Sequence, residues 1–189
     1  MSRALARTWL LLSVAVLAAA PVRAAGIDPA RSEVGFQLVT RWREVVDGRF
    51  PVFHGRLTRL PDGRQQVQVS LSTADVEIVG NRRHTQVTRG RGFFDAARHP
   101  WIRFSSDPFD PSLLLEGGAL PGTLEIRDVS RRERFTVLPS ACARPAVDCP
   151  VQAAGLVDRT HYGMNRWSFA VGRMVRFHLS IHVAREDAG

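Results

Sequence analysis

The sequence lacks the motifs on which most enzyme active sites depend. It has no Walker or dinucleotide-binding glycine pattern, and no Gly-x-Ser-x-Gly elbow to expose a serine nucleophile. Its two cysteines are too few for a zinc site, and its six histidines are scattered. His178 and His182 are four residues apart, which on a strand places them roughly 13 Å from each other, too far to share an ion. We therefore expect no catalytic residues, no metal and no cofactor.

Lysine is also absent, so all 26 basic residues are arginine, against 18 acidic residues. Three of these arginines fall in residues 1–24, which contain no acid, so the remainder carries 23 − 18 = +5 charges. A positive charge of this size is compatible with transient contact with a membrane surface. The single Arg-Gly-Arg-Gly run at residues 89–92 is too isolated for a nucleic-acid-binding tail, and we expect no nucleic acid partner.

The first 24 residues have the pattern of a secretory signal peptide. Arg3 and Arg7 precede an apolar run at residues 9–20, and Val22-Arg23-Ala24 forms a cleavage pattern before Ala25. The apolar run is shorter than the ~20 residues that span a bilayer, so we expect cleavage and export. Residues 25–189 are then long enough for one domain with its own core.

The only two cysteines, Cys142 and Cys149, flank a proline-containing loop. In an exported protein, two cysteines seven residues apart are typical of a disulfide that closes a loop. A redox motif would require Cys-x-x-Cys, which the chain does not contain.

Alternation of apolar and polar residues is the dominant pattern of the chain. In residues 175–183, Val175, Phe177, Leu179, Ile181 and Val183 share one face of a strand. Shorter versions recur at residues 34–39, 53–57, 66–72, 101–105, 124–126, 135–137 and 151–157, with a hairpin expected around residues 128–132. Residues 81–91 lack the alternation and predict a short helix or a long loop. About eight strands at this spacing predict an antiparallel sandwich or barrel, and a barrel has no exposed edges.

Several motifs, in order along the chain, resemble those of one known family. They are Phe93-Phe94-Asp95 followed by Pro100-Trp101-Ile102-Arg103-Phe104-Ser105, Gly122-Thr123-Leu124-Glu125-Ile126, Arg159-Thr160-His161-Tyr162-Gly163-Met164, and Val171-Gly172-Arg173-Met174-Val175. Together they are similar to the YceI-like family over nearly all of residues 25–189. The resemblance implies an all-β, lipocalin-like, eight-stranded antiparallel barrel with one short helix, located in the bacterial periplasm. It also implies an apolar channel that binds a long-chain amphiphile, such as a polyisoprenoid or an isoprenoid quinone.

The chain departs from the family pattern at three positions. Arg31 and Thr40 stand where the family has histidines, which alters recognition of a polar headgroup at the channel mouth. Asp128 replaces the hairpin glycine, and a turn that tolerates Asp accommodates it.

The predicted ligand-binding residues are inward-facing apolar side chains and two polar candidates for the headgroup. They are Phe36, Leu38, Val69, Leu71, Phe104, Leu124, Ile126, Phe135, Phe177, Leu179 and Ile181, with Arg159 and Tyr162 at the mouth. A planar guanidinium suits a phosphate or a quinone headgroup, although an arginine bonded to neighbouring carbonyls would instead shape its loop.

Three functions remain open at this stage. The strands of a filled barrel and of a hollow one have the same apolar–polar period in the sequence. The resemblance alone therefore favours a ligand cavity. The first alternative is a packed barrel that docks on a membrane or an acidic partner, and the second is a hydrolase that uses His161. The sequence predicts neither the identity of the lipid nor the oligomeric state.

Overall fold

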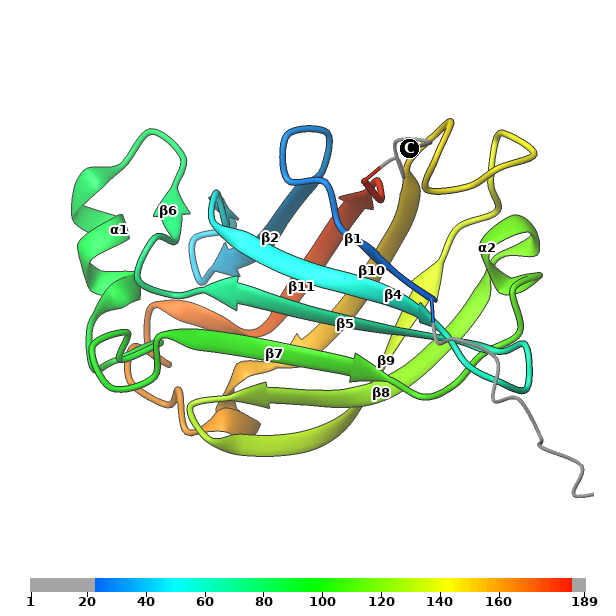
Figure 1. The fold of residues 1–189 in the computed structure, drawn as a ribbon. Coiled ribbons are helices and arrows are strands. Elements are labelled where there is room, and N and C mark those ends of the chain that lie inside the picture. The colour runs from blue at the N-terminus through cyan, green and yellow to red at the C-terminus, as the bar shows by residue number, and fades with distance from the viewer. Residues whose placement is uncertain (1–22, 185–189) are drawn as a thin grey trace, which may run out of the picture.

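The computed structural model describes residues 23–184, which form one eleven-stranded antiparallel sheet (Figure 1). The strands are β1 (Arg23–Gly26), β2 (Glu33–Thr40), β3 (Val45–Arg49), β4 (Phe53–Arg59), β5 (Gln65–Ser72), β6 (Glu77–Ile78), β7 (Trp101–Ser106), β8 (Gly118–Ile126), β9 (Val129–Val137), β10 (Val151–Asp158) and β11 (Val171–Ile181). Their order across the sheet is β1-β4-β5-β7-β8-β9-β10-β11-β2-β3-β6. The predicted signal peptide lies outside the described residues, apart from Arg23 and Ala24 at the start of β1.

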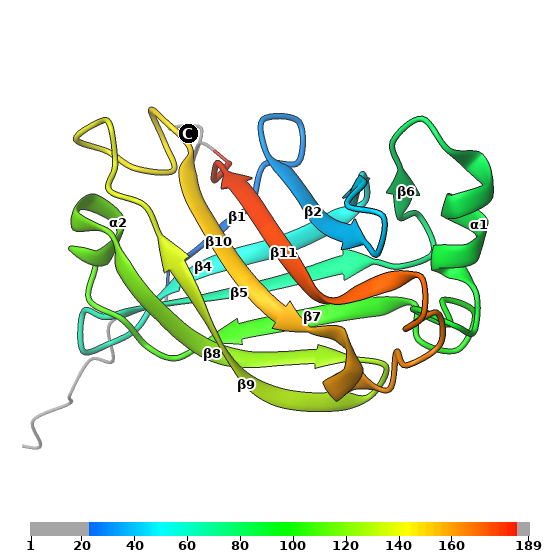
Figure 2. The ribbon, with the colours of Figure 1, turned by 180° about the vertical axis from the view of Figure 1, so that it is seen from behind.

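The sheet curls around a common interior, which confirms the predicted all-β, lipocalin-like fold. In Figures 1 and 2, strands β4, β5 and β7 form one wall, and β9, β10 and β11 form the opposite wall. Eight of the eleven strands have six residues or more, which is the predicted number. The additional strands β1, β3 and β6 have two to five residues.

The chain that follows β1 closes one end of the barrel. The Ile27 N–H donates to Gly55 O at 2.9 Å, while the Asp28 N–H donates to His182 O at 2.9 Å. The Ala184 N–H in turn donates to Gly26 O at 2.7 Å. This segment therefore bonds both β4 and the chain beyond β11, which lie far apart in the strand order.

Two α-helices stand at opposite ends of the barrel, α1 (Arg82–Arg89) and α2 (Leu113–Glu116) (Figure 1). The first lies within the segment predicted as a helix or a loop, and it begins where the Asn81 side chain accepts the His84 N–H at 2.9 Å. The second was not predicted, because a four-residue helix is too short to show a helical period. No helix among residues 23–184 is long and apolar enough to cross a bilayer.

The β8–β9 hairpin turns earlier than the sequence predicted. Arg127 and Asp128 form its two-residue turn, with φ angles of 53° and 60°. Positive φ at both positions is typical of the turns that match the twist of a hairpin, and Asp tolerates this region. The residues from Val129 to Arg132, expected in the turn, therefore belong to β9.

Candidate functional site

An apolar cavity occupies the half of the barrel nearer α2. Its volume is about 100 Å³, and all of its lining side chains are aliphatic or aromatic. The strands β4, β5, β7, β8, β9, β10 and β11 contribute Leu57, Val67, Val69, Leu71, Ile102, Phe104, Leu120, Leu124, Phe135, Val137, Val151, Ala153, Phe177, Leu179 and Ile181. Segments outside the strands contribute Ile27, Phe109, Leu114, Ala146 and Val183. A site of this kind has no polar group to hold water and favours a nonpolar occupant.

Glycines on the neighbouring strands account for the space in the cavity. Gly155 of β10 lies in register with Phe135 of β9 and with Phe177 of β11. A Cβ atom at Gly155 would lie 2.6 Å from two carbons of the Phe135 ring, so the ring lies flat over this glycine. Gly122 of β8 is covered in the same way by the ring of Phe104, 2.5 Å from the position of a Cβ atom. Both rings therefore lie against the wall and leave the interior open.

A cluster of phenylalanines separates this cavity from a smaller one. Phe177 packs against Phe36, Phe50 and Phe135, with ring centroids 6.2, 6.4 and 6.5 Å away. The smaller cavity, of about 20 Å³, is lined by Phe36, Leu38, Thr88, Phe93, Phe94, Ile126, Val157, Arg159, Met164, Val175 and Phe177. Among residues 23–184, Phe177 alone lines both cavities.

Arg159, which begins the 3₁₀ turn η1 (Arg159–Tyr162), is buried beside the smaller cavity, with 1 % of its surface exposed. Its guanidinium donates to the carbonyls of Gly172 at 2.9 Å, Val171 at 3.0 Å and Arg166 at 3.1 Å, and also to that of Met164. Four of its five N–H groups are thus bonded to the segment that leads into β11 and to the first two residues of that strand. Burial lowers the pKa of Arg159, and the charge of Asp158 opposes that effect. These contacts match the loop-shaping alternative considered for this arginine.

Tyr162 is fully buried, and its hydroxyl donates to Glu133 Oε1 at 2.8 Å. Burial and the neighbouring Glu133 carboxylate both raise the pKa of the phenol, so the hydroxyl stays protonated. Tyr162 lines neither of the two cavities.

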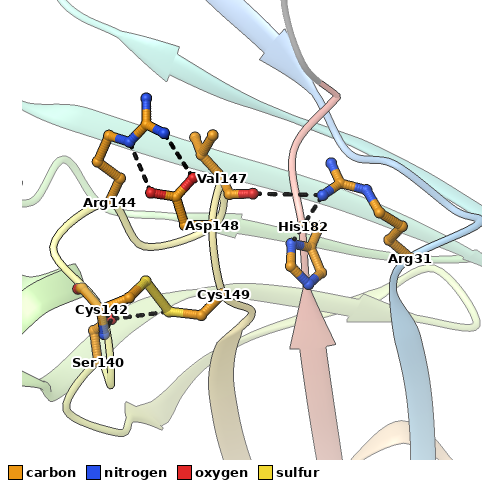
Figure 3. The surroundings of a disulfide bond; sticks show 8 residues. All are labelled: Arg31, Ser140, Cys142, Arg144, Val147, Asp148, Cys149 and His182. Atoms are coloured by element: carbon orange, nitrogen blue, oxygen red, sulfur yellow. Dashed lines mark hydrogen bonds and ion pairs between the residues drawn. A yellow bond between two sulfur atoms is a disulfide. The ribbon is translucent and has the colours of Figure 1, made fainter.

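The end of the larger cavity farthest from Phe177 lies under the loop that carries the disulfide. Cys142 and Cys149 are bonded, as predicted, with their Cα atoms 6.2 Å apart (Figure 3). Ala146 of this loop lines the cavity, and its carbonyl accepts the Val183 N–H at 2.9 Å. The loop therefore covers the cavity and is tied both to itself and to the chain beyond β11.

Arg31 is a polar side chain at this covered end. Its guanidinium donates to Val183 O at 2.8 Å. It also donates to Val147 O at 3.4 Å, and its Nη1 lies 3.5 Å from His182 Nδ1 (Figure 3). Asp28 accepts from Arg31 Nε at 2.7 Å, and this hydrogen bond lowers the pKa of the carboxyl. About a third of the Arg31 side chain remains exposed, at 34 %. Part of this side chain is therefore open to solvent, next to Val183 of the cavity lining.

Most of the predicted site residues come together around the two cavities. Val69, Leu71, Phe104, Leu124, Phe135, Phe177, Leu179 and Ile181 line the larger one. Phe36, Leu38, Ile126 and Arg159 line the smaller one. Their contact with a ligand stays a prediction.

Other lining residues were missed for two reasons. Ile102 carries a readable signal, because it alternates with Phe104 in the same strand and faces the same side. Ile27, Phe109, Leu114 and Ala146 lie in loops or in the short helix α2, where no period-two pattern exists to place them.

Comparisons with known proteins agree with this architecture. Residues 26–183 match the YceI-like domain. Among solved structures, BcnA of Burkholderia cenocepacia is similar with a TM-score of 0.65 at 20 % identity, over 84 % of this chain and 99 % of that one. A polyisoprenoid binding domain from Saccharophagus degradans, implicated in plant cell wall breakdown, has a TM-score of 0.62 at 13 % identity, over 82 % of this chain and 95 % of that one. The YCEI protein of Campylobacter jejuni has a TM-score of 0.53 at 17 % identity, over 74 % of this chain and 85 % of that one.

At these identities the structural likeness shows a shared fold. A search of curated proteins finds no match. The domain match, however, spans most of the chain and includes every motif on which the resemblance was based. This chain belongs to the YceI-like family.

Proposed function

We propose that this protein is a non-enzymatic binding protein that holds the apolar part of a lipid-like amphiphile, such as an isoprenoid, inside its barrel. The observation that carries the proposal is the larger cavity, whose lining contains only apolar side chains. Burial of a hydrocarbon there contributes roughly 0.8 kcal/mol per CH₂ group. The family likeness supports the same ligand class, because one structural neighbour is a polyisoprenoid binding domain.

The polar end of the amphiphile lies beside Arg31 in this proposal. Arg31 donates to Val183, which lines the cavity together with Ala146, and about a third of the Arg31 side chain is exposed. A guanidinium binds phosphate, carboxylate or carbonyl oxygens well. Arg159, the first headgroup candidate from the sequence, is buried and has four carbonyl partners, so it is the weaker candidate for this role.

The protein acts in the periplasm in this proposal, after cleavage between Ala24 and Ala25. The disulfide between Cys142 and Cys149 supports an oxidising compartment, because such bonds are rare in the cytosol. Cell fractionation followed by N-terminal sequencing tests this directly. Mature periplasmic protein that begins at Ala25 supports the proposal. Uncleaved protein that begins at Met1 and is found in the cytosolic fraction contradicts it.

Organic extraction of natively purified protein, followed by mass spectrometry, tests the binding function. We expect a stoichiometric amphiphile from the wild type and none from Leu179→Arg, which places a charge in the cavity lining. A matched control is Leu156→Arg in the neighbouring strand, because Leu156 is 53 % exposed and faces outward. Absence of any bound lipid in the wild type, together with failure to bind added prenols, contradicts the proposal and favours a packed interaction module.

A second proposed contact is with an anionic membrane surface, and an exposed patch at the end of the barrel opposite the disulfide supports it. The patch consists of Val39, Trp42, Val45 and Phe169. Trp42 and Phe169 are 70 % and 71 % exposed, and the Arg41 N–H donates to Ala170 O at 2.9 Å, which brings the two segments together. Arg41, Arg43 and Arg166 are exposed in the same segments. Aromatic rings beside arginines suit the headgroup region of a bilayer.

Sedimentation with lipid vesicles tests this contact. Binding to vesicles that contain phosphatidylglycerol, but not to pure phosphatidylcholine, is expected for the wild type. The double variant Trp42→Ser and Phe169→Ser is expected to lose that binding. Equal sedimentation of the variant and the wild type would show that this patch does not bind the vesicles.

A further inference from the structure

We propose that the cleft between α1 and β6 binds a phosphate monoester group. The cleft lies on the outside of the barrel, where α1 stands beside β6 (Figure 1). It shares no lining residue with either apolar cavity, so this site is separate from the proposed lipid-binding site.

The cleft is polar, open and positively charged. Its volume is about 620 Å³, which is large enough for a small phosphate ester. Strands β3 and β6, the loop after β6 and helix α1 contribute Arg49, Glu77, Ile78, Val79, Gly80, Asn81, Arg82, Thr85, Gln86 and Arg89. Three arginines against one glutamate give the lining 3 − 1 = +2 charges.

Helix α1 forms one wall of the cleft with a single face. Four of its residues line the cleft, at the spacing i, i+3, i+4 and i+7 that places side chains on the same side of a helix. They are Arg82, Thr85, Gln86 and Arg89. Thr88 does not line the cleft; it is buried and lines the smaller cavity instead. The helix therefore packs on the barrel with one side and presents its arginines to the cleft with another.

Hydrogen bonds hold the two walls of the cleft together. The Thr85 hydroxyl accepts the Ile78 N–H at 2.8 Å and donates to Asn81 O at 3.1 Å. These bonds join α1 to β6 and to the residue that caps the helix. The cleft is thus formed before a ligand binds, which lowers the entropic cost of binding.

Two guanidiniums in the cleft have N–H groups to spare. Arg89 donates from Nε to Val76 O at 2.9 Å, which anchors one edge of its guanidinium to a fully buried residue. Its two terminal nitrogens have no partner among residues 23–184. Arg82 makes no hydrogen bond or ion pair within the same range. Unpaired N–H forks of this kind are the donors that oxyanions bind best.

The charge of the cleft distinguishes a phosphate from a carboxylate. Arg49 binds Glu77 Oε2 through Nε at 2.7 Å and through Nη2 at 2.6 Å, so these two residues neutralise each other. The net charge of +2 therefore comes from Arg82 and Arg89. A phosphate monoester carries about −1.5 to −2 charges and three terminal oxygens, which matches two guanidiniums. A carboxylate has only one charge and two oxygens.

Isothermal titration calorimetry with glycerol 3-phosphate tests the proposal on the purified protein. Sodium chloride keeps the ionic strength constant, so that general screening does not change during the titration. We expect saturable, one-to-one binding. Sodium acetate is expected to bind at least about tenfold more weakly, because it has half the charge and fewer acceptor oxygens.

Four variants assign the binding to the cleft. Arg82→Gln breaks no contact within the protein and is expected to weaken binding by about tenfold, whereas Arg89→Lys keeps the charge but loses the fork and is expected to weaken it by about threefold. Glu77→Gln raises the charge of the cleft to about +3 and is expected to strengthen binding by about threefold or more. Arg56→Gln is the matched control, because Arg56 is exposed on β4 and does not line the cleft. It loses the same charge and is expected to stay within about twofold of the wild type.

Vesicles that contain phosphatidic acid distinguish a lipid headgroup from a soluble ester. The background for this assay is Trp42→Ser with Phe169→Ser, which removes the other proposed membrane contact. Sedimentation that is lost on adding Arg82→Gln identifies a lipid headgroup in the cleft, and any other result identifies a soluble ester.

Three calorimetric results would overturn the proposal. The first is a wild type without saturable binding of glycerol 3-phosphate, and the second is acetate that binds as tightly as the ester. The third is a loss of affinity in Arg56→Gln as large as that in Arg82→Gln, which would mean that the ester responds only to the overall charge of the protein.

Discussion

Gly155→Ala is expected to narrow the cavity without replacing any residue that lines it. The new methyl group points inward, in register with Phe135 and Phe177. It would lie 2.6 Å from the Phe135 ring, whereas carbon atoms in contact are about 3.5–4.0 Å apart. The ring therefore has to move by about 1 Å, and the open side available to it is the cavity.

The size of the effect follows from this displacement. Overpacking of a core costs about 1–3 kcal/mol in the free energy of unfolding. Replacing glycine by alanine also stiffens the unfolded chain, which offsets about 0.4–1 kcal/mol of that cost. Gly26→Ala carries the same offset without a clash, since no atom lies within 4 Å of its Cβ position. We therefore expect Gly155→Ala to be less stable than Gly26→Ala by about 1–3 kcal/mol.

Ligand binding provides the second readout. If the displaced ring removes the space of one methylene group, the affinity for farnesol falls by about 0.8 kcal/mol, which is about fourfold. Urea unfolding and displacement of anilinonaphthalene sulfonate measure the two effects. Phe135→Leu in the Gly155→Ala background is expected to recover most of the lost affinity, because the smaller side chain removes the clash. Equal stability and equal affinity of Gly155→Ala and Gly26→Ala would refute the idea that this glycine keeps the cavity open.

Four further predictions follow. Leu179→Arg is expected to abolish uptake of anilinonaphthalene sulfonate while the far-UV circular dichroism stays native, and retained uptake would show that this face does not contact the ligand. Cys142→Ser is expected to lower the free energy of unfolding in urea by about 2–3 kcal/mol, and dithiothreitol should lower the wild type equally but leave the variant unchanged. Arg159→Met leaves four carbonyls without their donor and is expected to lower the free energy of unfolding by about 3 kcal/mol or more. Its affinity for farnesol is expected to stay within about twofold of the wild type. A loss of affinity without a loss of stability would instead support a headgroup role. In the acid range, folding lowers the pKa values of Asp28, Asp62, Asp107 and Asp110 below 3.8. Their contribution is complete above about pH 4 and is lost as the pH falls through the lowered pKa values. Urea midpoints should therefore be level above about pH 4 and drop below it, and a flat profile across this range would contradict the prediction.

Much of the fold was predictable because the period of a half-buried strand is visible in the sequence. In β11, Val175 and Phe177 are buried while Arg176 and His178 are exposed, as the alternation indicates. The start of β9 was harder to place, because Ser130, Arg131 and Arg132 are exposed on both faces and show no alternation. The hairpin was therefore expected to turn within β9, although its backbone continues as a strand. The apolar–polar alternation arises because one face of a strand is buried. It is therefore absent where a strand extends beyond the core.

The site was only partly predictable, for a different reason. Alternation reveals that Phe135 and Phe177 face inward, but it says nothing of whether their rings project into the interior or lie along the wall. Arg159 illustrates a second limit. Its place in a family motif is visible in the sequence, yet its role depends on carbonyls of residues 164–172, which a loop of irregular backbone brings around it. Side-chain direction at a loop has no periodic signature.

The glycines within the strands supply the missing information, and they separate a hollow barrel from a filled one. A phenylalanine beside a large inward neighbour has to project into the interior, where it fills space. A phenylalanine beside an inward glycine can instead cover that glycine, as Phe104 does at Gly122 and Phe135 at Gly155. The pairing is costly for a strand, because glycine there has more conformational entropy to lose and no side chain to pack. Two such pairs border the larger cavity, and a third, Phe36 over Gly48, packs against Phe177 between the two cavities. A barrel selected only for stability would replace these glycines with side chains that fill the gap, so their presence argues that the space itself is used.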